Sequence, residues 1–97
     1  MDKELDFNQD FDFINNTGYT YFNGKKLVLV KYYNYIGPIT LQYLPNGGIQ
    51  SVFNYHLIIK VNNGFIACDE LIYDGVKMNS KTFIMKYPNL INQVLPS

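Results

Sequence analysis

Four steps in which Asn or Asp precedes Gly divide most of this sequence into short segments. They are Asn23-Gly24, Asn46-Gly47, Asn63-Gly64 and Asp74-Gly75. Such pairs supply the two positive-φ positions of a type I′ turn, which joins antiparallel strands through only two residues. A chain with this spacing of turns is expected to fold into short strands joined by hairpins.

The segments between these turns are rich in Val, Ile, Tyr and Phe, which strands favour. The predicted strands are Lys25–Tyr35, Ile39–Leu44, Ile49–Asn54, His56–Val61 and Phe65–Tyr73. Several short strands at close spacing predict a small barrel or a sandwich. A closed or nearly closed barrel would also hide the strand edges, which a chain of low charge needs.

Alternation along the first predicted strand assigns its side chains to two faces. The expected division is Leu27, Leu29, Tyr33 and Tyr35 on one face, and Val28, Val30 and Tyr32 on the other.

The last part of the chain departs from this period of two. A short helix is predicted from Met78, Phe83, Ile84, Met85 and Tyr87, with Asn79 as its N-cap and Pro88 ending it. The predicted fold is therefore all-β with one short C-terminal helix.

Charge divides the chain into two parts. The 97 residues carry eight lysines, no arginine and eight acidic residues, and charged residues make up 16% of the chain, against about 25% in typical domains. In the first twelve residues, five acids outnumber the single Lys3, a net charge of −4, which leaves +4 on the rest. Zero net charge and the lack of arginine argue against a strongly electrostatic nucleic-acid binder.

The same division suggests the domain organisation. We expect residues 1–17 to be an acidic tail or docking arm, residues 18–88 to be a β-barrel domain, and residues 89–97 to be an extended C-terminal end. The acidic start and apolar runs of only four or five residues predict neither a secretory leader nor a membrane span. The expected location is the cytoplasm, with no membrane partner.

Cys68 and His56 are the only residues of their types. They exclude an intramolecular disulfide and a Cys/His zinc cluster, and no metal or cofactor is predicted. Cys68 with His56, oriented by Asp69, is a candidate nucleophile–base pair, but an apolar strand favours a structural cysteine. Asp69 and Glu70 are neighbours on a strand, so they are expected to point to opposite faces.

Two stretches of the chain follow a further pattern. The first stretch, residues 18–29, contains Gly18-Tyr19-Thr20 and then Gly24-Lys25-Lys26-Leu27. The second stretch, residues 58–83, contains the turn residue Gly64, a predicted strand, Gly75-Val76-Lys77-Met78 and a predicted helix that reaches Phe83. Their order resembles the C-terminal domain of methionyl-tRNA formyltransferase and related formyltransferases. That pattern runs Gly-Ala-x-Thr, Gly-Lys-x-Leu, a turn Gly, then Gly-Lys-Lys before a Met-Ser-led helix. Here the Gly-Lys-Lys step is one residue shorter and one lysine poorer, and Asn79 replaces the Ser.

The resemblance implies an OB-like, partly open Greek-key barrel, which in that family follows the catalytic domain and helps to hold tRNA. The family's catalytic elements belong to the other domain, and nothing in this sequence matches them. We therefore expect a non-catalytic accessory domain that works with a catalytic formyltransferase domain, in cis or in trans, of the methionyl-tRNA or amino-sugar type. If tRNA is the ligand, the candidate contacts are Lys25, Lys26, Lys31, Lys77 and Lys81.

Two other function classes stay open. Sparse charge and nine tyrosines suit a protein-interaction or oligomerisation module, such as a homodimer, because interfaces are enriched in aromatic residues and depleted of charge. A small enzyme that uses Cys68 and His56 is the third.

Overall fold

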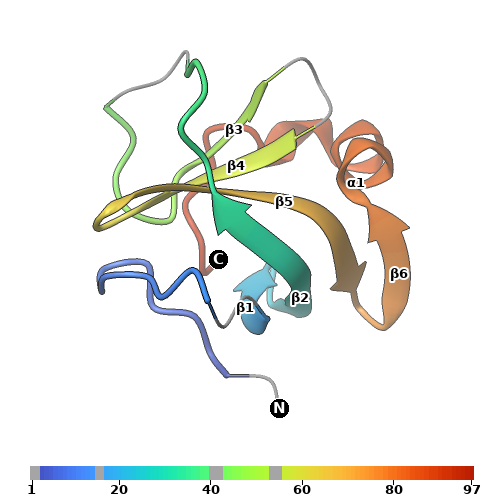
Figure 1. Cartoon of the computed structure of the whole chain (residues 1–97). Helices are drawn as coiled ribbons and strands as arrows, with labels where there is room; N and C mark the ends of the chain where they lie inside the picture. The colour runs from blue at the N-terminus through green and yellow to red at the C-terminus, as the bar shows by residue number, and fades with distance from the viewer. Residues whose placement is uncertain (1–2, 15–16, 40–42, 53–55) are drawn as a thin grey trace.

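The computed structural model of the protein describes residues 3–14, 17–39, 43–52 and 56–97 (Figure 1). These residues form one antiparallel sheet of six strands and one short α-helix, so the all-β fold class is confirmed. The strands are β1 (Gly18–Phe22), β2 (Lys25–Asn34), β3 (Ile49–Val52), β4 (His56–Val61), β5 (Gly64–Tyr73) and β6 (Val76–Asn79). The helix α1 (Ser80–Lys86) follows β6 directly, and a single 3₁₀ turn, η1, spans Pro88–Leu90.

The ten-residue strand β5 organises the sheet. One of its edges pairs with β2, and the other pairs with β4 over its first half and with β6 over its second half. The order is β1-β2-β5-β4-β3, with β6 beside β5. Figure 1 shows β5 as a long curved strand that passes from β4 to β6. The sheet therefore curves around a core, as in a small barrel.

The C-terminal residues link the two outer strands of the sheet. At β3, the Asn92 amide donates to the Ile49 carbonyl and the Ile49 amide donates to the Gln93 carbonyl, both at 2.9 Å. At β1, the Ser97 amide donates to the Tyr21 carbonyl at 2.8 Å. Residues 92–97 therefore run from β3 to β1 and close the sheet into a barrel-like shell, which leaves fewer backbone groups unpaired at its edges.

The acidic N-terminal residues pair with the same edge of β1. The Tyr19 amide donates to the Lys3 carbonyl at 2.9 Å, and the Leu5 amide donates to the Tyr19 carbonyl at 2.8 Å. Leu5, Phe7 and Phe11 are 5%, 2% and 9% exposed and belong to the hydrophobic core. The segment predicted as a tail or docking arm thus carries three core side chains, while the division of the chain at residue 17 stays a prediction.

Glycine leaves room where each terminal segment crosses the sheet. Gly47 has a φ of +91°, its carbonyl accepts the Leu95 amide at 2.8 Å, and a Cβ there would collide with the Leu95 carbonyl oxygen. A Cβ on Gly18 would collide with the side chain of Leu5. The lack of a side chain at these two positions lets the terminal segments approach the barrel closely.

Two of the four Asx-Gly steps have the predicted type I′ geometry. Their φ values are +52° and +76° at Asn23-Gly24, and +51° and +83° at Asp74-Gly75. At the other two steps only the glycine has a positive φ, so the type I′ prediction is wrong there. At Asn63-Gly64 the difference comes from the strand register. Gly64 already pairs with Val61 and belongs to β5, so it is not one of the two turn residues.

A β-bulge changes the exposed face in the middle of β2. The register to β5 shifts between Leu29 and Lys31 and again between Lys31 and Tyr32. Leu29 is fully buried and Tyr32 is 1% exposed, whereas Tyr33 is 38% exposed. The prediction that Tyr33 shares the face of Leu29 while Tyr32 lies opposite is therefore wrong, because the irregular register reverses the faces of the residues that follow.

The helix begins at the predicted cap. The Asn79 side-chain oxygen accepts the Thr82 amide at 2.8 Å, as an N-cap does. Met78, predicted in the helix, instead lies in β6, where it pairs with Leu71. Within the described residues, neither α1 nor any other helix has the length and apolarity that crossing a membrane requires.

The segment after the helix contributes to the core. Residues 89–97 were expected to be extended, but they begin inside η1, and Leu90 and Leu95 are buried. Nearby, the rings of Phe22, Tyr73 and Phe83 pack with centroids 5.2–5.7 Å apart.

Part of the strand prediction falls outside the described residues. The predicted strand Ile39–Leu44 includes residues 40–42, and the predicted strand Ile49–Asn54 includes residues 53–54. The described part of the second forms β3.

We predict that Gly47→Ala destabilises the protein more than Gly75→Ala. Both glycines have a positive φ, which costs a residue with a side chain about 1–2 kcal/mol. A Cβ on Gly75 meets nothing within 4 Å, whereas one on Gly47 meets the Leu95 backbone. The collision should add about 1–3 kcal/mol to the free-energy loss on urea unfolding. Equal losses in the two variants would contradict the crossing of the C-terminal segment at Gly47.

Candidate functional site

The structure brings two of the five candidate lysines, Lys26 and Lys77, to one face of the sheet. Strand pairing places Tyr19, Val28, Ile72 and Lys77 in one row across β1, β2, β5 and β6, and Tyr21 with Lys26 in the next row of the same face. We call these six residues the outer face. Lys31, at the bulge of β2, pairs with Glu70, two residues from Ile72 along β5.

The other two candidate lysines lie apart from the outer face. Lys25 opens β2 opposite the buried Phe22. Lys81 is in the first turn of α1, where it borders a small hollow shared with His56 and Asp69.

Acidic side chains lie near two of the candidate lysines, of which only Lys77 belongs to the outer face. Lys77 Nζ lies 3.9 Å from Glu70 Oε2, and Lys25 Nζ lies 3.7 Å from Asp74 Oδ2. All four side chains are more than half exposed, so water and salt screen these pairs. Lys26 Nζ lies 4.6 Å from the ring centroid of Tyr19, a cation–π contact. The outer face therefore combines aromatic rings with two cations: Lys26, which contacts the Tyr19 ring, and Lys77, which forms a weak pair with Glu70.

His56, Asp69 and Tyr33 form a polar cluster at the surface. The His56 Nδ1 lies 2.8 Å from Asp69 Oδ1, and the Tyr33 hydroxyl donates to Asp69 Oδ2 at 3.3 Å. The pKa of Tyr33 is raised, mainly because the side chain is partly buried and in second place because Asp69 is negatively charged. Among the described residues, no group of three His, Cys, Asp or Glu side chains is placed to hold a metal ion.

Cys68 is buried, whereas the side chains of this cluster are partly exposed to solvent. Its side chain is fully buried, and its thiol donates to the Glu70 carbonyl at 3.0 Å. Burial raises the pKa of Cys68 to about 12. A nucleophilic cysteine needs a thiolate near neutral pH, so the geometry does not favour the nucleophile–base pair with His56.

We predict that Cys68 resists alkylation in the folded protein. With a pKa of about 12, three units above its ordinary value, the thiolate fraction at pH 8 falls roughly a thousandfold. Iodoacetamide should therefore react at least that much more slowly with the native protein than with the protein in 8 M urea. The native rate should also keep rising with pH beyond pH 9. A native rate within tenfold of the denatured rate would contradict the burial of the thiol.

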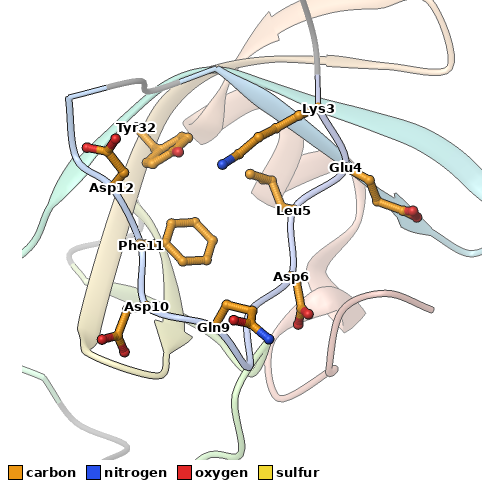
Figure 2. Close-up of a pocket in the computed structure, with 9 residues that line it drawn as sticks. All are labelled: Lys3, Glu4, Leu5, Asp6, Gln9, Asp10, Phe11, Asp12 and Tyr32. Carbon is orange, nitrogen blue, oxygen red and sulfur yellow. The ribbon is translucent and has the colours of Figure 1, made fainter.

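A hollow of about 330 Å³ lies between the N-terminal segment and β2 (Figure 2). Leu5 and Phe11 face one another across it, and Tyr32 closes one side. Asn63 holds the segment in place, because its side-chain oxygen accepts the Phe11 amide at 2.9 Å and its side-chain nitrogen donates to the Phe11 carbonyl at 3.2 Å.

Sequence reasoning did not find this hollow. The available signal was the spacing of Phe7 and Phe11, two apolar rings in a segment that otherwise carries acids. No local sequence pattern marks the bulge that turns Tyr32 inward, and without Tyr32 the hollow has no second aromatic wall.

The fold and these surfaces define a small, barrel-like, all-β domain. Comparison with protein-family models, with curated proteins and with solved structures found no match.

Proposed function

We propose that this protein is a non-catalytic accessory domain that works with a formyltransferase catalytic domain, in cis or in trans, and helps to hold a tRNA or an amino-sugar substrate. The proposal rests on the resemblance of the two sequence stretches. These stretches coincide with structural units, because residues 18–29 span β1, its turn and part of β2, while residues 58–83 span most of β4, all of β5 and β6, and the start of α1.

The outer face is the observation that carries the binding part of this proposal. Lys26 and Lys77 share it with Tyr19 and Tyr21, and Tyr21 is 38% exposed. Aromatic rings beside cations on a sheet are a common arrangement for binding nucleic acids, since bases stack on rings and phosphates pair with lysines. The pair of Lys77 with Glu70 is exposed and weak, so a phosphate can replace the carboxylate.

A protein-interaction module, including a homodimer, is the second candidate function. The half-buried Val28 and Ile72 and the exposed Val76, at 55%, favour it. Apolar side chains of this kind contribute to protein interfaces more than to phosphate contacts. A salt-insensitive dimer in size-exclusion chromatography at low and high salt would support this function over the first.

We predict that Lys26→Ala and Lys77→Ala each weaken tRNA binding. Each removed phosphate contact should lower the slope of log K against log salt by about one unit. Binding would be measured by fluorescence anisotropy with unmodified tRNA from 20 to 200 mM salt.

Lys86→Ala is the matched control, because Lys86 is an exposed lysine in the last turn of α1, outside the candidate set. Its salt slope should equal that of the unsubstituted protein. Equal slopes in all four proteins, or no binding at 20 mM salt, would contradict a tRNA-binding outer face.

A further inference from the structure

The hollow beside the N-terminal segment has an aromatic lining. Phe11 and Tyr32 line it and pack edge to face with ring centroids 5.5 Å apart, while Phe7, outside the lining, stacks on Phe11 at 5.6 Å. Leu5 lies opposite Phe11 (Figure 2). Such walls can pack against the apolar part of a ligand, and the faces of aromatic rings also attract cations. A hollow of about 330 Å³ lies within the size range of small-ligand pockets.

The acidic residues around this hollow have different roles. Asp6 Oδ1 accepts the Asn8 amide at 3.0 Å, and Asp10 Oδ1 accepts the Asn62 side-chain amide at 2.6 Å, so both contribute to local structure. Asp12 Oδ1 accepts the Ile14 amide at 2.9 Å. The pKa of the Tyr32 hydroxyl is raised mainly by burial, and the negative charge of Asp12 raises it further. Figure 2 shows Asp12 next to Tyr32 and the side chain of Glu4 directed away from the hollow, so Asp12 is the carboxylate beside the aromatic wall.

A cation of the chain itself reaches into this hollow. Figure 2 shows the Lys3 side chain extending between Leu5 and Tyr32, with its amino group directed toward Tyr32. Among the described residues, no carboxylate oxygen lies within 4 Å of Lys3 Nζ. The apolar methylene chain of Lys3 thus carries an ammonium group into the hollow, and no close ion pair with a described residue holds that group there.

We propose that this hollow binds an ammonium group carried on an apolar stem, with Phe11 and Tyr32 against the stem, Asp12 beside the charge, and Lys3 as a weakly held internal competitor. The ligand chemistry is that of a lysine side chain or of a free alkylamine. This site lies outside the outer face and does not depend on the proposed accessory function.

The test uses two cationic probes, each with a neutral analogue of similar shape. The free amine is n-butylammonium, compared with n-butanol, and the side chain is acetyl-Gly-Lys-Gly-amide, compared with its norleucine analogue. Binding to the full chain would be followed by the ¹H–¹⁵N spectrum. We expect the cationic probes to shift the amides of Leu5, Phe11 and Tyr32, and the neutral analogues to bind several times more weakly.

Two substitutions should change the affinity in opposite directions. Asp12→Asn keeps an oxygen that can accept the backbone amide but removes the charge, and it should weaken cation binding roughly two- to fivefold, the range for an exposed ion pair. Lys3→Met keeps the stem but removes the competing ammonium, and it should strengthen binding. Asp74→Asn, at a distant turn, is the control and should change nothing.

The outcomes separate the possible sources of the ligand. Binding of both cations supports a lysine side chain as ligand, and binding of n-butylammonium alone supports a free amine. The proposal is overturned if neither cation binds, if n-butanol binds as well as n-butylammonium, or if Lys3→Met does not strengthen binding. A spectrum of each variant that matches the unsubstituted one outside the hollow shows that the fold is intact.

Discussion

The structure depends on the hydrogen bonds that join the C-terminal residues to both outer strands. An antiparallel sheet of this size has two edges with unpaired amides and carbonyls, which favour pairing with other chains. Here, residues 92–95 pair with residues 47–49, which lead into β3, and Ser97 pairs with β1. The Ser97 carbonyl also accepts the Gly24 amide at 2.9 Å, which ties the first hairpin to the closure.

The two candidate surfaces depend on how the strands and the ends of the chain pair. The outer face needs β1, β2, β5 and β6 in register, so that Tyr19 and Lys77 lie in one row. The hollow needs the N-terminal segment to lie against β1, where Lys3 and Leu5 pair with Tyr19 on the edge that Ser97 also uses. The two ends of the chain therefore share one strand edge, and Gly18 and Gly47 leave the space that their backbones occupy.

Local chemistry made much of the fold predictable. Asx-Gly turns specified two hairpins, and Asn79 marked the start of α1, because both signals act within a few residues. The bulge in β2 was not predictable in this way, since it depends on how β2 and β5 pair over long range. As a result, Tyr32 and Tyr33 were assigned to the wrong faces. The burial of Phe7 and Phe11 also depends on partners far along the chain, such as Asn63.

Amide hydrogen exchange tests the closure most directly. In the closed barrel, the amides of Ile49, Leu95 and Ser97 donate to carbonyls across the two edges at 2.8–2.9 Å. These amides should therefore exchange almost as slowly as the amides of β4 and β5, because their hydrogen bonds break only when the sheet opens. Fast exchange at Leu95 and Ser97, with β4 and β5 still protected, would show that the barrel is open between β3 and β1 and would contradict this account.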